Sequence, residues 1–206
     1  MFITLEGPEG CGKTSQAAPL ADYLRSRGCS VLSLREPGST PIGEQVRAVL
    51  FNPDNSAMHL RTEILLFQAS RAQLVEQVIR PHLVGGGVVV CDRYADSTLA
   101  YQGYGYQLDL APLRALIDFA TGALKPDLTL LLDLDVEAGL RRKAKGEEWN
   151  RLDAMELAFH QRVRQGYLEM ARADAGRWVV IDATGPFTQV QETIRRAVME
   201  RLTARR

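Results

Sequence analysis

The strongest constraint on the fold lies at the start of the chain, where an apolar segment runs into a glycine-rich turn. Residues 2–6 are Phe-Ile-Thr-Leu-Glu, a β-prone run, and residues 7–14 are Gly-Pro-Glu-Gly-Cys-Gly-Lys-Thr. This spacing is typical of a P-loop, whose successive backbone N–H groups point at phosphate oxygens. A helix-compatible segment follows, and the positive end of its dipole faces the same point. The stretch predicts a strand, a loop that binds a nucleoside triphosphate, and a helix.

The side chains of this loop have distinct predicted roles. Lys13 reaches the β- and γ-phosphates, and Thr14 offers its hydroxyl to Mg²⁺. We expect the nucleotide to contact the whole loop, which consists of Gly7, Pro8, Glu9, Gly10, Cys11, Gly12, Lys13, Thr14 and Ser15. A glycine-rich turn that matches by chance is the alternative, and the strand before and helix after argue against it.

Length and charge narrow the class of protein further. A chain of 206 residues suits a single domain over 1–206, and 25 basic residues balance 25 acidic ones, so the sequence carries no overall basic field for a nucleic acid. No apolar run approaches the ~18 residues of a membrane span, and the first residues enter a strand directly. We therefore expect a cytoplasmic protein that binds neither nucleic acid nor membrane. The three cysteines have no metal-ligand spacing.

Further strands and helices alternate along the rest of the chain. Apolar runs predict strands over 31–34, 88–91, 126–132 and 178–181, and periodic patterns predict helices over 13–27, 42–50, 58–80, 96–102, 109–121, 136–143, 154–174 and 187–203. We expect Arg80-Pro81 to close the long helix and Gly103-Tyr-Gly105 to break the chain between two helical pieces. Five strands in this order predict a three-layer α/β/α sandwich with a parallel sheet.

Ligands of such a sheet gather outside the carboxyl ends of its strands, which places Gly7, Arg35, Asp92 and Asp133 along one rim. Asp92 follows a fully apolar strand, where a P-loop protein places a second carboxylate toward Mg²⁺. A polar residue that merely ends the strand is the alternative, but it leaves the neighbouring Arg93 unexplained. The planar guanidinium groups of Arg35 and Arg93 present paired N–H donors that suit a second phosphate. They indicate a phosphorylated second substrate.

Two other patterns allow a structural or a functional interpretation. Phe67 and Arg71 lie at i and i+4 of the long helix, so they can stack on a base and donate to its edge, although helical aromatics are more often core residues. Residues 141–151 contain five basic side chains, which form either a solvated helix face or a mobile lid at about 142–153 over the reacting phosphates. Glycine occupies position 10 of the P-loop, so the lid has to supply the charge for the transferred group.

Five blocks of the sequence, taken together, resemble the bacterial thymidylate kinases, which are P-loop nucleoside monophosphate kinases that phosphorylate dTMP with ATP. The resemblance spans nearly the whole chain. The blocks are residues 6–14, Arg35-Glu-Pro-Gly-Ser-Thr-Pro-Ile-Gly-Glu44, Leu65-Leu-Phe-Gln-Ala-Ser-Arg71, Asp92-Arg-Tyr-Ala-Asp-Ser-Thr-Leu-Ala-Tyr-Gln-Gly103 and Pro126-Asp-Leu-Thr-Leu-Leu-Leu-Asp133. Many families share the first block, whereas the second and fourth are much narrower.

The resemblance implies how the acceptor nucleotide binds. Glu9 approaches the sugar and phosphate, Arg35 and Arg93 hold the phosphate, Pro37 shapes the pocket, and Tyr101 lies against the deoxyribose. At the base, Phe67 stacks on thymine, Arg71 donates to a carbonyl, and the remaining edge is contacted by Ser97 and Gln102.

For the donor, the resemblance implies an adenine pocket made by the lid base near Arg141 and by the loop 182–185. The expected catalytic residues are Lys13, Asp92, Arg93, Arg142 and Arg151, with Mg²⁺ on Thr14 and Asp92. The family also implies a homodimer, through the long helices. A general base is not required, because a nucleoside monophosphate is largely dianionic near pH 7.

The chain departs from the family pattern at two places. Ser39 stands where a second glycine is usual, and the lid ends in Asn150-Arg151-Leu152-Asp153 in place of the familiar Asp-Arg-[Ile/Phe]-Glu. The sequence leaves open which lid arginine, Arg142 or Arg151, contacts the transferred phosphate.

Two other functions were weighed against a thymidylate kinase. Another nucleoside monophosphate or deoxynucleoside kinase of the same fold is the closer one, because the polarity of hydrogen bonds to the base cannot be read from a sequence. A regulatory GTPase needs an Asn-Lys-x-Asp motif that binds the guanine base. Leu124-Lys-Pro-Asp127 lacks the polar first residue and leads straight into a strand.

Overall fold

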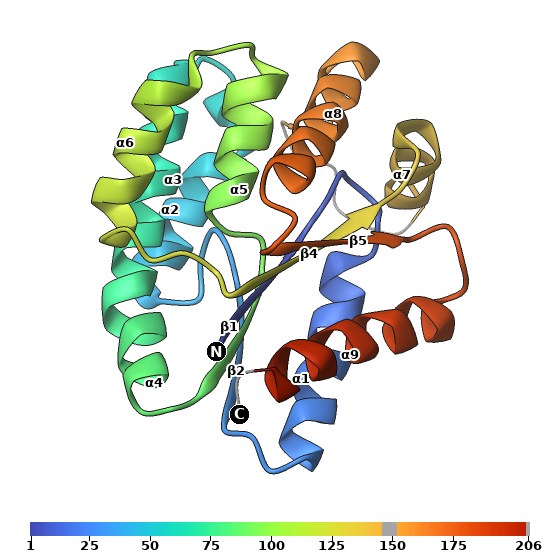
Figure 1. The fold of residues 1–206 in the computed structure, drawn as a ribbon. Helices are drawn as coiled ribbons and strands as arrows, with labels where there is room; N and C mark the ends of the chain where they lie inside the picture. The colour runs from blue at the N-terminus through green and yellow to red at the C-terminus, as the bar shows by residue number, and fades with distance from the viewer. Residues whose placement is uncertain (146–151, 205–206) are drawn as a thin grey trace.

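The computed structural model describes residues 1–145 and 152–204. A five-stranded sheet in the order β2-β3-β1-β4-β5 forms the centre, and all its neighbouring strands are parallel. Figure 1 shows α1 and α9 together on one face of this sheet and the group α3 to α6 with α8 on the other. The predicted three-layer α/β/α sandwich with a five-stranded parallel sheet is therefore confirmed.

The elements lie close to the predicted ranges. The strands are β1 (Phe2–Glu6), β2 (Val31–Arg35), β3 (Val88–Asp92), β4 (Leu128–Asp133) and β5 (Trp178–Asp182). The helices are α1 (Lys13–Ser26), α2 (Pro41–Phe51), α3 (Leu60–Leu74), α4 (Arg80–Val84), α5 (Ala95–Thr98), α6 (Leu110–Thr121), α7 (Val136–Lys143), α8 (Leu157–Ala173) and α9 (Phe187–Thr203). A short 3₁₀ turn (Pro53–Asn55) and π-helical segments at Val75–Ile79 and Leu99–Gly105 complete them.

Side chains of the central strands alternate between two hydrophobic cores. Ile3 and Leu5 of β1 join the core under α1 and α9, whereas Phe2 joins the core under the segment 74–79. Val90 and Val89 of β3 divide in the same way. Because both faces are covered, these strands are apolar at almost every position, as expected for a parallel sheet between helices.

The long helix predicted over 58–80 does not end at Pro81, and this prediction was wrong. The π-helical segment Val75–Ile79 follows α3, and α4 then continues through Pro81 to Val84. The backbone N–H of Arg80 bonds to the carbonyl of Val75, five residues back. Such a π turn shifts the hydrogen-bond register, and Pro81 then sits in the first turn of α4, where its missing N–H costs little.

The predicted break at Gly103-Tyr-Gly105 was also wrong, because the helical backbone runs from α5 through the π segment to Gly105. These glycines serve close packing. A Cβ on Gly103 would collide with the side chain of Leu110, and one on Gly105 would lie 2.6 Å from the ring of Phe159. The π segment thereby packs tightly against α6 and α8.

A search of the described helices finds none that is long and apolar enough to cross a membrane. In the same part of the chain the cysteines are unpaired, and no three His, Cys, Asp or Glu residues gather as a metal cluster.

Candidate active site

The carboxyl ends of β1, β2 and β3 open into one cavity of about 1050 Å³. Its wall contains most of the residues selected from the sequence: Glu9, Gly10, Gly12, Lys13, Thr14, Ser15, Arg35, Pro37, Phe67, Arg71, Asp92, Arg93, Ser97, Tyr101 and Gln102. The fold thus brings the P-loop and the residues expected around a second nucleotide into a single space, as the strand-end rule predicts.

The P-loop adopts a tight turn that helix α1 continues. Gly12 lies at φ 91°, in the left-handed region that favours glycine, and α1 begins at the next residue. The Lys13 ammonium donates to the carbonyls of Gly7 at 3.1 Å and Pro8 at 2.8 Å. Lys13 therefore closes the loop on itself, and its contact with phosphate oxygens stays a prediction.

Position 10 has room only for glycine. A Cβ built there would collide with the backbone of Gly139 in α7, so the P-loop and α7 are in direct backbone contact. An arginine inside the loop is excluded on steric grounds.

Thr14 and Asp92 meet beside the P-loop. The Thr14 hydroxyl donates to Asp92 Oδ2 at 2.6 Å, and Asp92 Oδ1 is buried with no hydrogen-bond partner among the described residues. A hydroxyl and a carboxylate are the hard oxygen ligands that Mg²⁺ takes together with substrate phosphates. These two side chains fit the metal that the sequence predicts.

Arg93 is the centre of a buried polar network. Its Nη2 donates to Glu9 at 2.7 Å and to the Tyr101 hydroxyl at 3.0 Å, and its Nη1 donates to Gly7 O and the Tyr167 hydroxyl, each at 3.2 Å. Its own backbone lies at φ 67°. Burial alone would lower the pKa of Arg93, but Tyr101 and Glu9 outweigh it and hold that pKa well above its usual value. The guanidinium is therefore a fixed positive charge at the rim.

Glu9 receives a second cation from α7. Lys143 Nζ lies 3.2 Å from Glu9 Oε2 and 3.0 Å from Asp153, and its side chain is only 8% exposed. Burial would raise the pKa of Glu9, but Arg93, Lys13 and Lys143 together hold it well below its usual value. Lys143 belongs to the basic cluster 141–151 but was not among the site residues predicted from the sequence. Residue spacing gave no sign that the side chain of Lys143 points into the cavity.

The loop after β2 is shaped by Glu44 of α2. Glu44 accepts two hydrogen bonds from Arg35, at 3.0 and 2.9 Å, and one from the Ser39 backbone N–H at 2.7 Å. Ser39 lies at φ 61°, in the left-handed region that favours the glycine expected from the family pattern. The Ser39 hydroxyl accepts a hydrogen bond from the backbone N–H of Arg35 and donates one to its carbonyl. Arg47 also lines the cavity and was missed, although its position one turn after Glu44 on α2 placed it on the same side.

Arg71 is 2% exposed and almost fully engaged. Its Nε bonds to Glu36 at 2.8 Å, its Nη1 bonds to Gln68 and Thr98, and its Nη2 donates to the carbonyl of Tyr94. A guanidinium has five N–H donors, so within the described chain one donor on Nη2 is left for a ligand. The contacts fix the direction in which Arg71 can donate.

The residues expected at the base and sugar line the same cavity as Arg71. Phe67 is partly buried and meets Phe51 edge to face. Tyr101 donates to Glu9 at 2.6 Å, and Gln102 donates to the buried Glu63 at 2.7 Å. Ser97 lines the cavity, and its hydroxyl donates to Glu6 at 2.6 Å. The part played by each in binding stays a prediction.

Arg141 and Arg142, which the sequence predicts at the adenine pocket and in the lid, are absent from the wall of this cavity. Arg141 is exposed and pairs with Glu137 on the same helix, whereas Arg142 donates to the carbonyls of Ala183 and Thr184 in the loop after β5. Arg151 and most of the predicted lid, residues 146–151, lie outside the described residues.

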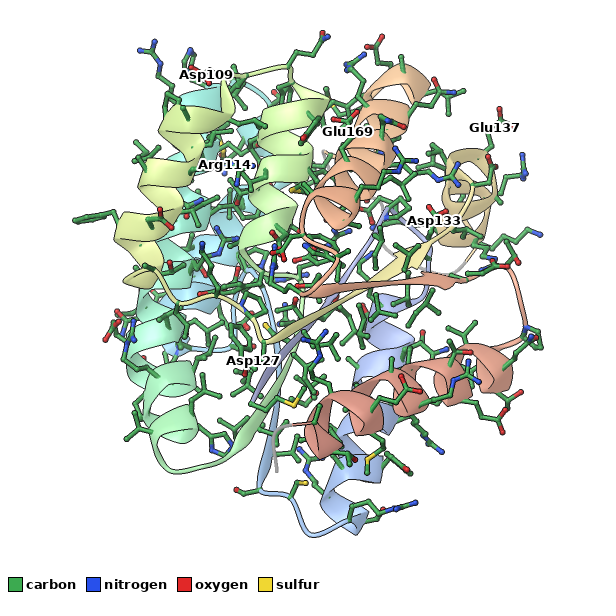
Figure 2. All side chains as sticks on the ribbon, in the orientation of Figure 1. Asp109, Arg114, Asp127, Asp133, Glu137 and Glu169 are labelled. Carbon is green, nitrogen blue, oxygen red and sulfur yellow. The ribbon has the colours of Figure 1, made fainter. Side chains whose placement is uncertain are left out.

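Asp133, the fourth residue expected at the rim, is absent from the cavity wall. Figure 2 shows it at the tip of β4 between α7 and α8. There it accepts two hydrogen bonds from Arg164, at 2.7 and 2.9 Å. This bidentate ion pair fastens α8 to the rim of the sheet.

Glu6 binds two residues, Ser97 and Tyr167, that in turn contact Arg93. It is fully buried at the end of β1 and accepts hydrogen bonds from Tyr94 N at 2.8 Å, Ser97 at 2.6 Å and Tyr167 at 2.9 Å. Burial, with a smaller contribution from Asp96, raises the pKa of Glu6 to about 7. The role of Glu6 was not predicted, because in the sequence it ends an apolar strand and begins the P-loop block, and neither pattern shows its partners.

Comparisons with known proteins agree in one family. A family model described as thymidylate kinase matches residues 5–194. Among curated relatives, a thymidylate kinase of Deinococcus radiodurans is 51% identical and one of Herpetosiphon aurantiacus is 49% identical, and each alignment covers 98% of this chain and 97% of the relative. The crystal structure of a thymidylate kinase from Ehrlichia chaffeensis superposes with a TM-score of 0.80 at 31% identity, over 96% of this chain and 98% of that one.

The raised pKa of Glu6 predicts a pH-dependent stability difference. Between pH 4.5 and 7 the folded state keeps a proton that the unfolded chain has lost, so stability falls as pH rises through this window. We expect wild type to lose about 2–3 kcal/mol relative to Glu6→Gln between pH 4.5 and 7.5. Urea unfolding of both proteins across this range measures it, and parallel pH profiles for the two would contradict the assignment.

Proposed function

This chain belongs to the thymidylate kinase family, and we propose that it transfers the γ-phosphoryl group of ATP to dTMP, giving dTDP and ADP. The observation that carries the proposal is a single cavity in which a P-loop faces a second set of cations, Arg35 and Arg93, beside an aromatic ring and an arginine from α3. One triphosphate does not need this second anion site, whereas a monophosphate acceptor does.

The proposed chemistry is alignment and charge neutralisation. The P-loop amides and Lys13 hold the donor phosphates, and Arg93, with Arg35, holds the acceptor phosphate. A general base is unnecessary, since the acceptor is largely dianionic near pH 7. The five contacts of the Arg93 guanidinium support this role, because a donor that is already oriented loses little freedom when the phosphate binds.

Mg²⁺ is part of the proposal, with Thr14 and Asp92 as its protein ligands. The unpartnered Oδ1 of Asp92 and the adjacent hydroxyl supply hard oxygens, and phosphate oxygens complete the coordination. When bound, the ion neutralises charge that develops between the phosphates. Asp92 and Thr14 thus orient each other before the metal binds.

We assign part of the charge over the transferred group to Lys143. Arg93 binds one carboxylate oxygen of Glu9, and the Lys143 ammonium binds the other. No arginine fits at position 10 of the P-loop. Arg142 instead faces the loop 182–185, where the family resemblance places adenine. The role expected for Arg151 remains a prediction about a residue outside the described part of the chain.

The acceptor pocket supports a deoxyribonucleotide with a pyrimidine base. Phe67 offers a stacking surface beside Arg71, and Pro37 lines the same wall. Tyr101 is held against Glu9 by a 2.6 Å hydrogen bond, so its ring occupies a fixed position next to the expected sugar. A rigid ring there disfavours a 2′-hydroxyl.

We also propose a homodimer that works in the cytoplasm, where its nucleotide substrates are found. Large apolar side chains are exposed on three neighbouring helices: Ile42 (53%) and Val49 (45%) on α2, Leu65 (56%) on α3 and Phe119 (90%) on α6. Figure 1 shows these helices side by side on one flank of the molecule. An apolar patch of this kind fits a second copy of the chain.

The proposed reaction is tested by ADP release with ATP and Mg²⁺ against dTMP, dUMP, dCMP, UMP, dAMP and dGMP. We expect dTMP to have the highest kcat/KM and Lys13→Ala to lose at least about a hundredfold of it, because that cation contacts the transferred charge. A preference for a purine would refute the proposed acceptor site. No transfer at all, with tight GTP binding, would refute the kinase proposal.

Lys143→Met is expected to lower kcat by about a hundredfold with a much smaller effect on KM for ATP, because it removes charge that acts on the transferred group. Lys145→Ala, an exposed lysine two residues further on, is the matched control and should stay within twofold. Asp153→Asn removes a carboxylate partner of Lys143 and keeps the lysine. Equal losses in K143M and D153N would assign Lys143 a structural role only.

The dimer proposal predicts that Phe119→Asp yields monomers in analytical ultracentrifugation at a concentration where wild type sediments as a dimer. A buried charge at the centre of an apolar interface is not compensated. Val84→Asp places the same charge on another exposed apolar residue, outside the three-helix patch, and should leave the dimer intact. Wild-type protein that sediments as a monomer would contradict the proposed dimer.

A further inference from the structure

The polarity of hydrogen bonding to the base depends on the orientation of one side-chain amide. Gln102 lies in the cavity wall with Phe67 and Arg71. A glutamine presents a carbonyl oxygen from one end of its amide and an NH₂ group from the other, and the two are interchangeable in shape. Whichever end faces the cavity decides whether a ligand must donate or accept at that point.

Glu63 removes this ambiguity. Gln102 Nε2 lies 2.7 Å from Glu63 Oε1, and both side chains are buried, with Glu63 fully inaccessible in the first turn of α3. Glu63 Oε1 accepts this hydrogen bond, so the end of the amide that faces the carboxylate is the NH₂ group. The opposite orientation would bring a carbonyl oxygen against a carboxylate in a buried site, which is strongly unfavourable. The carbonyl oxygen of Gln102 is therefore the end available to a ligand.

The neighbouring donor completes a directional pattern. Three N–H donors of Arg71 bind Glu36, Gln68 and Thr98. The Nη2 atom uses one N–H for the backbone carbonyl of Tyr94 and keeps the other for a ligand. The wall thus offers one acceptor and one donor. Thymine presents the complementary pair, an N3–H donor beside a carbonyl acceptor. Cytosine presents an unprotonated N3 at the same position, which would face the carbonyl oxygen of Gln102.

We propose that Glu63 is a positioning residue that sets base specificity: by fixing the amide of Gln102 it makes the acceptor site select a base with an N3–H donor and reject cytosine. The inference rests on the proposed function of the site as a dTMP kinase. Glu63 is absent from the cavity wall, and its hydrogen bond to Gln102, which lines that wall, is the contact through which it acts. The competing explanation, that Glu63 only stabilises the start of α3 by its charge, predicts no effect on the choice of base.

The test compares kcat/KM for dTMP and dCMP in the same enzyme preparation. Their ratio does not depend on the fraction of folded protein, so a loss of stability in a variant cannot imitate a loss of specificity. In Glu63→Gln the partner of Gln102 can donate as well as accept, and both orientations of the Gln102 amide become available. We expect the ratio to fall about tenfold, the effect of one misaligned hydrogen bond, with dTMP becoming a poorer and dCMP a better substrate.

Two controls separate positioning from general damage. Glu76→Gln neutralises an exposed glutamate that pairs with Arg80 further along the same helical segment, and it should leave the ratio unchanged. Glu63→Asp keeps an acceptor-only partner, so it should retain most of the selectivity even where total turnover drops. A ratio that falls as far in E63D as in E63Q would overturn the proposal.

A double-mutant cycle provides the decisive comparison. In a Gln102→Ala background no amide remains to be oriented, so adding Glu63→Gln should leave the dTMP to dCMP ratio unchanged. An undiminished effect of E63Q in that background, or no effect of E63Q in the wild-type background, would overturn the assignment while leaving the kinase function intact. A wild-type enzyme without any preference for dTMP over dCMP would instead refute the proposed function, and the inference with it.

Discussion

The partly buried ion pair between Arg93 and Glu9 is the interaction on which the rest of the site depends. It joins the residue after β3 to the loop after β1 at 2.7 Å, and hydrogen bonds from Arg93 extend it to Tyr101 and Tyr167. Lys143 brings α7 onto the other carboxylate oxygen. Removing Glu9 would leave the positive charges of Arg93 and Lys143 without the carboxylate that they share. The elements around the cavity are thus held together by the charges that the proposed reaction uses.

Such a network contributes little to net stability, because the cost of desolvating its charges offsets their attraction. Its value is orientation. Glu6, itself buried with a pKa of about 7, fixes Ser97 and Tyr167, and both of these contact Arg93. Glu63 fixes Gln102 by the same principle, so a second layer of carboxylates sets the direction of the residues that face the ligands. A site built this way reorganises little during phosphoryl transfer.

Agreement between sequence and structure was closest where one local rule governed the outcome. The ranges of α7 and α9 and the place of all five strands followed from periodicity and apolar runs. Local rules failed where a tertiary contact replaced them. Pro81 is accommodated by a π turn that no periodicity shows, and Gly105 serves contact with Phe159 although its residue type indicates a break. The role of Glu6 was missed for a similar reason, since its partners come from the loop after β3 and from α5 and α8.

By itself the sequence determined the α/β/α sandwich, the phosphate-binding loop and the set of residues that gather at the carboxyl ends of the strands. Residue spacing and strand order are local properties, and they suffice for these conclusions. Only the tertiary structure decided direction: that Lys143 turns into the cavity while Arg142 faces the loop after β5, and that the amide of Gln102 presents its oxygen. The direction in which a polar group points depends on partners far away in the chain, such as Glu63, 39 residues from Gln102, and no local pattern contains them.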